Sequence, residues 1–146
     1  MNQRRLFWEG CVNTRDLGGL RTTGNRITRS GAIVRSDTPT RLTEAGWSEL
    51  HAYGIRTIVS LHTFGIEEEG LTVTPPFPDV VAIRAAIEDF TDKVFVQQWV
   101  DTSLWGTPLY YRDALERWPQ RHAAAISAIA RARPGGVLFH CVRGYD

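Results

Sequence analysis

Cysteine is scarce in this sequence: its 146 residues include only Cys11 and Cys141. Two cysteines so far apart exclude the disulfide frameworks that hold small secreted domains together. They are typical of a protein whose thiols stay reduced, and we therefore expect a cytoplasmic protein. Each cysteine must then be judged as a free thiol, which is either a small apolar core residue or a reactive group.

An excess of charge and long apolar runs are also absent. Seventeen basic and sixteen acidic residues leave a net charge of +1, so the sequence predicts no general attraction to nucleic acid. No stretch approaches the ~20 apolar residues of a membrane span, and no apolar core follows the N-terminal arginines as in a signal peptide. The composition, 42% hydrophobic and 23% charged, is typical of a soluble globular protein. We expect residues 1–146 to form one domain.

Short apolar runs alternate with helical patterns along the chain. We expect strands at 32–35, 55–61, 80–83 and 137–140, a hairpin at 18–28, and helices from Thr43, across 92–118 with a break near 106–108, and from Pro119 to 130. This alternation predicts an α/β fold with a mainly parallel central sheet flanked by helices. In such sheets, ligands bind beyond the carboxyl ends of the strands.

The helix after Thr43 has recognisable ends. Thr43 is suited to the N-cap, and Gly54 is suited to the position just after the helix. Near-helical spacing predicts an apolar side formed by Ala45, Trp47, Leu50 and Tyr53.

Cys141 stands where the last expected strand ends, and it opens a short loop that contains a glycine. A loop that turns its backbone N–H groups inward binds phosphate oxygens and favours a thiolate. We therefore expect Cys141 to be the nucleophile and Asp146 to be the acid that protonates the leaving oxygen. The phosphate-binding residues expected between them are Val142, Arg143, Gly144 and Tyr145, with Gly144 allowing the backbone to approach the anion.

The residues of this loop also have simpler interpretations. A cysteine at the end of a buried strand is often a small apolar core residue. His140 is expected on the opposite face from Cys141, so it is a supporting residue that braces the loop by hydrogen bonds rather than a proton-transfer partner. Arg143 is either solvated or reaches a negative group of the substrate.

The segment His140–Asp146 resembles the signature loop of the protein tyrosine phosphatase superfamily. More narrowly, it resembles the bacterial tyrosine and dual-specificity branch, whose loop reads His-Cys-x-x-Gly-Lys-Asp-Arg. Residues 13–19, Asn-Thr-Arg-Asp-Leu-Gly-Gly, resemble the Asn-x-Arg-Asp-x-Gly-Gly segment of that branch, and residues 35–43 resemble its Arg-Ser segment before the first helix. The resemblance implies a cysteine-dependent phosphatase without a cofactor. It favours phosphotyrosine, with phosphoserine, phosphothreonine or phosphoinositide as the other substrates.

Three departures from the branch stand out. Tyr145 occupies the position of the loop lysine, and Ser60-Leu61-His62 stands where the branch often has Asp-Leu-Arg. The position of the loop arginine follows Asp146 and lies beyond the printed sequence. We therefore expect a C-terminally incomplete catalytic domain. By itself this domain should have little or no phosphatase activity and should self-associate through an uncovered apolar sheet face.

Several other residues leave alternatives open. Arg15 and Asp16 either support the loop or hold the hairpin, and Asp37 is either an acid or a carboxylate at a helix entry. The aromatic residues either line a substrate pocket or belong to the core: Trp99, Trp105, Tyr110, Tyr111 and Trp118. His51, His62 and His122 lack the spacing of metal ligands, so we expect no metal.

The sequence predicts that the partner is a phosphorylated protein or a small phosphomonoester, with no nucleic acid. A non-catalytic relative that binds phosphorylated ligands, or serves a structural role, is the second hypothesis. A sulfur-transfer domain that carries a persulfide on Cys141 is the third, and Asp146 within the loop favours the phosphatase over it.

Overall fold

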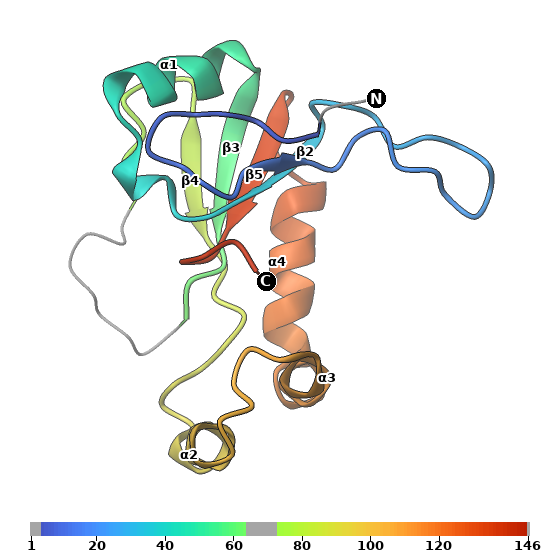
Figure 1. The fold of residues 1–146 in the computed structure, drawn as a ribbon, viewed down its shortest axis with the longest axis vertical. Coiled ribbons are helices and arrows are strands. Elements are labelled where there is room, and N and C mark those ends of the chain that lie inside the picture. Colours follow the sequence, from blue (N-terminus) through green and yellow to red (C-terminus); the bar gives the residue numbers. More distant parts are fainter. Residues whose placement is uncertain (1–3, 64–72, 146) are drawn as a thin grey trace.

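The computed structural model describes residues 4–63 and 73–145, which form a central sheet with helices around it (Figure 1). The strands are β1 (Arg15–Asp16), β2 (Ile33–Ser36), β3 (Ile55–Ser60), β4 (Val81–Arg84) and β5 (Gly136–His140). The helices are the 3-10 helix η1 (Pro39–Arg41) and the α-helices α1 (Glu44–Ala52), α2 (Lys93–Asp101), α3 (Pro108–Arg117) and α4 (Pro119–Ala130). None of the helices in the described ranges has the length and apolarity needed to cross a membrane.

The five strands lie in the order β1-β2-β5-β3-β4. Strands β2, β5, β3 and β4 are parallel, and only β1 runs antiparallel to its neighbour. Because His140 pairs with Ser36 on one side and with Ser60 on the other, three central strands end at the same level. The predicted α/β fold with a mainly parallel sheet is confirmed, and Cys141 follows the middle strand at its carboxyl end.

Each face of the sheet has its own apolar core. On one face, Ile58 and Leu138 pack against Leu50 of α1 and Trp8 of the N-terminal segment. On the other face, Val59 and Val137 pack against α4, whose Ala125 is buried. Covering helices on both faces explain why β3 and β5 are apolar runs rather than alternating sequences.

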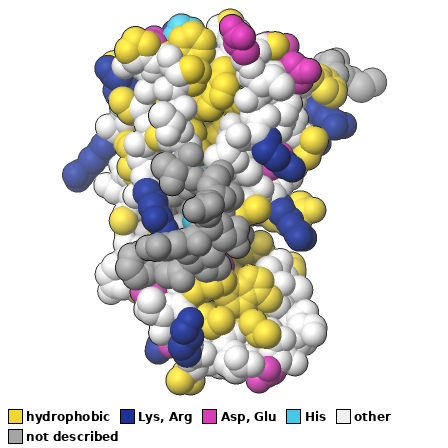
Figure 2. All heavy atoms as spheres, turned by 90° about the vertical axis from the view of Figure 1, so that its left-hand side faces the viewer, with side chains coloured by type: hydrophobic (Ala, Val, Ile, Leu, Met, Phe, Trp, Pro, Cys, Tyr) yellow, Lys and Arg dark blue, Asp and Glu magenta, His cyan; other side chains and the backbone are white. Residues whose placement is uncertain are grey.

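The aromatic residues of α2 and α3 form a third cluster. Trp99, Tyr110 and Trp118 are buried against one another, with Trp105 and Tyr111 packed at the edge. The two helices lie beyond the carboxyl ends of the strands (Figure 1), and hydrophobic side chains gather at that end of the molecule (Figure 2). These aromatic residues therefore belong to the core rather than to the wall of a substrate pocket.

Helix α1 begins as the sequence predicts. The Thr43 hydroxyl caps it by accepting a hydrogen bond from the Gly46 N–H at 3.2 Å, and Gly54 follows its end with a φ of +99°. The predicted apolar side is wrong at Ala45, which is exposed. The buried position is held by Gly46 instead. The N-terminal segment packs so closely there that a Cβ atom would meet the Glu9 carbonyl oxygen.

The predicted hairpin is also present. The N–H of Gly19 donates to the Thr28 carbonyl, the N–H of Thr28 donates to the Leu20 carbonyl, and Arg21 pairs with Ile27 in an isolated antiparallel bridge. The hairpin projects away from the sheet (Figure 1).

Candidate active site

Cys141 is a partly exposed free thiol directly after β5. The backbone N–H of Gly144 donates a hydrogen bond to its sulfur atom at 3.0 Å. A donor aimed at sulfur stabilises a thiolate more than a thiol, because the negative charge strengthens the hydrogen bond. The loop thus turns back on the cysteine, as a nucleophile requires.

Glycine is the only residue that fits position 144. Its φ of +76° lies in the left-handed region that other residues rarely adopt. A Cβ atom there would also lie 2.7 Å from the Asp37 nitrogen and 2.9 Å from the Ser36 oxygen. The loop therefore rests directly on the end of β2, and this contact fixes how far Gly144 stands from Cys141.

Two side chains hold the carbonyl groups of the loop. The Asn13 amide nitrogen donates to the carbonyl oxygens of Arg143 and Gly144 at 3.0 and 3.1 Å, and the Arg35 guanidinium donates to the Gly144 oxygen at 2.6 Å. In a trans peptide, the C=O of one residue and the N–H of the next point in opposite directions. Fixing these two carbonyls therefore turns the N–H groups of Gly144 and Tyr145 away from Asn13. For Gly144, that direction is toward the sulfur of Cys141.

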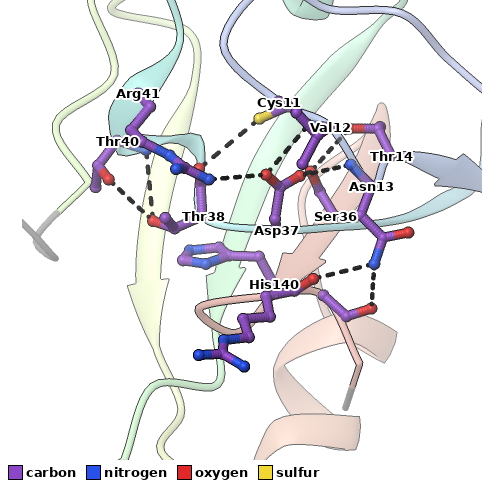
Figure 3. Close-up of polar contacts among 12 residues, drawn as sticks. Cys11, Val12, Asn13, Thr14, Ser36, Asp37, Thr38, Thr40, Arg41 and His140 are labelled. Carbon is purple, nitrogen blue, oxygen red and sulfur yellow. Dashed lines mark hydrogen bonds and ion pairs between the residues drawn. The ribbon is translucent and has the colours of Figure 1, made fainter.

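Asp37 joins its own segment to residues 12–13 next to the loop (Figure 3). Its carboxylate is 1% exposed, accepts hydrogen bonds from the backbone N–H groups of Val12 and Asn13 at 3.2 and 3.0 Å, and contacts the Arg41 guanidinium at 3.3 Å. The next residue, Thr38, donates its backbone N–H to the Val142 carbonyl at 3.2 Å. A carboxylate so occupied orients Asn13 and supports the loop, which agrees with a structural role rather than with that of an acid.

Arg15 and Asp16 have their hydrogen-bond partners outside the cysteine loop. Arg15 donates to the neighbouring Thr14 carbonyl at 2.9 Å. The Asp16 carboxylate accepts from the N–H groups of Gly18 and Gly31 and from the hydroxyl of Tyr53. Burial alone would raise the pKa of Asp16, but these hydrogen bonds outweigh it and hold the pKa below its usual value. The Asp16 contacts hold the base of the hairpin against the end of α1.

His140 supports the first peptide of the loop. Its side chain is 2% exposed, and its Nδ1 lies 3.0 Å from the Cys141 carbonyl oxygen, to which it donates. Among residues 4–63 and 73–145, its Nε2 has no hydrogen-bond partner. Burial lowers the pKa of His140, and nearby His62 adds to this effect.

The lowered pKa of His140 predicts a pH-dependent stability. The folded protein favours the neutral ring, so the contribution of His140 is complete above the unfolded-state pKa of about 6.5 and is lost as the pH falls below it. In urea unfolding between pH 7.5 and 5, we expect the free energy of unfolding to decrease as the pH is lowered. In the His140→Asn variant, which keeps a donor near the Nδ1 position, the slope should be smaller by up to about 1.4 kcal/mol per pH unit. If the free energy of unfolding depends on pH equally in the two proteins, His140 is not the group whose pKa is lowered by folding.

Cys11 contrasts with Cys141. Its side chain is 8% exposed and donates weakly to the Thr38 carbonyl oxygen at 3.8 Å. Burial, reinforced by the nearby Asp37 carboxylate, raises the pKa of Cys11 to about 11. Cys11 is therefore a core thiol, and Cys141 is the cysteine whose setting suits a nucleophile.

The structure thus brings His140, Cys141 and Gly144 together, with Val142, Arg143 and Tyr145 in the same loop, and it leaves Arg15 and Asp16 in β1. Asp146 lies outside the described residues. The sequence did not single out Asn13 and Arg35 as site residues, although both belong to segments that carry the family resemblance.

The comparisons with known proteins agree with this geometry. Residues 6–146 match the model of a tyrosine phosphatase family. The chain belongs to that family. The match includes both the cysteine loop and the segments around Asn13 and Arg35 that hold it.

One curated relative supports the assignment. Over 143 residues, the chain is 25% identical to a Cupriavidus necator protein named "Putative tyrosine-protein phosphatase". The aligned region covers 97% of this chain and 52% of the relative, so the chain spans about half the length of that protein. Membership in the tyrosine phosphatase family agrees with the resemblance found in the sequence.

Proposed function

We propose that this tyrosine phosphatase family member hydrolyses phosphotyrosine through a phosphocysteine intermediate on Cys141. The contact between the Gly144 N–H and the Cys141 sulfur carries the proposal. It supplies a donor for the thiolate, and the carbonyl groups that Asn13 and Arg35 hold leave the loop N–H groups directed toward the same side. A set of N–H groups turned to one side is suited to the oxygens of a phosphate.

In the first step, the Cys141 thiolate attacks phosphorus and the bond from phosphorus to the tyrosine oxygen breaks. Asp146 gives its proton to that oxygen, so that the phenol leaves as a neutral molecule. In the second step, water attacks the phosphocysteine, Asp146 takes up the proton of the water, and inorganic phosphate leaves with the thiolate restored. The chemistry balances without a metal or a redox partner.

The rim of the loop favours an aromatic phosphate ester. Val12, Val142 and Tyr145 expose 71%, 41% and 67% of their surfaces beside the loop. Apolar and aromatic side chains at this position would pack against the flat ring of a tyrosine. A small phosphoserine side chain offers much less surface to such a rim.

The role of Asp146 is tested by the leaving group. In the protein as its gene encodes it, we expect Asp146→Asn to lower kcat/KM by about 10²–10⁴-fold for phenyl phosphate, whose leaving group needs a proton. The loss should be much smaller for an aryl phosphate with a strongly acidic phenol. The two substrates measured on the same variant control for misfolding, because a misfolded protein loses both activities alike. Equal losses would remove Asp146 from the proton-transfer role.

A further inference from the structure

Three arginines stand side by side at the edge of the sheet from which the hairpin projects (Figure 1). Arg5 pairs with Arg15 of β1 in an isolated antiparallel bridge, and Arg15 pairs with Arg35 of β2. Residues directly opposite each other in antiparallel strands have their side chains on the same face, with Cα atoms about 4.5–5.5 Å apart. These three residues therefore form one row across the strands, which we call the arginine row.

The arginine row lies on the same face of the sheet as α4. Arg35 is in register with Phe139 of β5, and Phe139 packs against the apolar core beneath α4. The nearest carboxylate in the sequence, Asp16, lies on the opposite face, where it accepts a hydrogen bond from Tyr53. The alternation of side chains along β1 thus keeps this carboxylate away from the row.

The charges of the arginine row are not neutralised within the part of the chain that the structure describes. None of its three guanidinium groups belongs to an ion pair there. Arg15 and Arg35 donate to backbone carbonyl oxygens, Arg35 also contacts the Asn13 side chain at 3.5 Å, and Arg5 lies over the Phe7 ring. Since each guanidinium has five N–H donors, most remain available. Like charges directly opposite one another destabilise a sheet, and a bound anion would remove this repulsion.

The spacing of the row favours linked phosphate groups over other anions. Carboxylates on one side of an extended peptide lie roughly 7 Å apart, because they are two residues apart. Linked phosphates share an oxygen atom, so their charges lie closer together, and each phosphate can accept two hydrogen bonds from one guanidinium. A membrane surface fits less well. Helix α4 stands on the same face and is about 10 Å across, so a flat bilayer would meet α4 before it reached Arg35.

We propose that the arginine row is a binding site for a soluble molecule with a chain of linked phosphate groups, either an inorganic oligophosphate or the phosphate chain of a nucleotide. The chain lies across the strands, and its charges face the three guanidinium groups. Arg35 keeps one nitrogen on the Gly144 carbonyl oxygen and binds the ligand through its other donors. The site is separate from the cysteine loop, and binding there does not depend on the reaction at Cys141.

The test is a calorimetric titration with tripolyphosphate. The protein as its gene encodes it carries Cys141→Ser, so that no phosphate is hydrolysed, and it is compared with Arg5→Gln and Arg15→Gln made in the same background. We expect each substitution to weaken binding at the row by about 10- to 100-fold, as when one charge-assisted contact is lost. Binding in the cysteine loop should stay the same. A titration with ATP distinguishes the sources: equal affinity shows that the phosphate chain alone is recognised, and tighter binding of ATP identifies a nucleotide.

Arg26→Gln is the matched control, because it removes the same charge from an exposed position on the hairpin, outside the row. It should bind tripolyphosphate as the parent does. Parent affinity in both Arg5→Gln and Arg15→Gln, or an equal loss in Arg26→Gln, would overturn the site. Tighter binding of a glutamate-rich peptide, or of vesicles that contain a phosphatidylinositol phosphate, would overturn it in favour of another partner.

Thermal unfolding without ligand gives a second readout. Because the three cations repel one another, we expect Arg15→Gln to unfold at the temperature of the parent or slightly above it. Tripolyphosphate should raise the unfolding temperature of the parent more than that of Arg15→Gln, since a ligand stabilises the folded state that binds it. A clearly lower unfolding temperature of Arg15→Gln without ligand would give Arg15 a structural role and would contradict the proposal.

Discussion

Replacing Cys141 with serine is expected to abolish hydrolysis of aryl phosphates, with a loss in kcat of about 10⁴-fold or more. The serine hydroxyl is not ionised near neutral pH, so it cannot attack phosphorus as the thiolate does. Binding of inorganic phosphate should remain, because the Asn13 and Arg35 contacts that hold the loop do not involve the sulfur. Steady-state kinetics and phosphate titration of the variant measure the two properties separately.

Cys11→Ser is the control for this experiment. The Cys11 thiol is buried and donates a hydrogen bond to the Thr38 carbonyl oxygen. It takes no part in the proposed reaction. We expect its replacement to keep kcat within a few-fold of the parent value. A Cys141→Ser protein that retains turnover, or a Cys11→Ser protein that loses it while staying folded, would reverse the roles of the two thiols.

Replacing Gly144 with alanine is the second change with a large expected effect. An alanine at a φ of +76° would place its Cβ 2.7 Å from the Asp37 nitrogen, so either the loop or the end of β2 must move. We expect the free energy of unfolding to fall by about 2–4 kcal/mol. We expect kcat/KM to fall by about 10²–10³-fold, as when one donor of an anion-stabilising site is lost. Urea unfolding and steady-state kinetics provide the two values.

Gly31→Ala is the control that separates two effects of Gly144→Ala: the collision of the new Cβ atom with the end of β2, and the strain of an alanine at positive φ. Gly31 has a φ of +73°, close to that of Gly144, but a Cβ atom there would meet nothing within 4 Å. This variant should show only the strain of the left-handed conformation, about 1–2 kcal/mol, with little change in kcat/KM. If the two variants behave alike, the contact between Gly144 and β2 does not position the loop.

The sequence predicted the fold, which the structure confirms, and it led to the proposal of Cys141 as the nucleophile, because both inferences depend on local patterns. Apolar runs predicted the strands β2 to β5 within one residue at each end, and the position of Cys141 after the last strand predicted the loop. Asn13 and Asp37 could not be assigned in the same way. Asn13 contacts the carbonyl of Arg143, 130 residues away, and no pattern near Asn13 indicates this pairing.

The choice between an acid and a structural role for Asp37 depended on three-dimensional information as well. From the sequence alone, a carboxylate that follows a strand can serve either as an acid or as a structural group. Only the N–H groups of Val12 and Asn13, which arrive from a distant segment, show that the carboxylate is already occupied. The aromatic residues of α2 and α3 needed the same information, because helical spacing describes a buried cluster and a pocket wall equally well.

The measurement that tests the central claim most directly is to trap the intermediate. The protein as its gene encodes it is mixed with an aryl phosphate, quenched in acid within milliseconds, digested and examined by mass spectrometry. We predict that the peptide containing Cys141 gains the mass of one phosphoryl group, that the peptide containing Cys11 does not, and that Cys141→Ser protein shows no adduct. Turnover of the substrate without any adduct on Cys141, or a Cys141 peptide that carries an extra sulfur atom instead, would contradict a phosphocysteine mechanism.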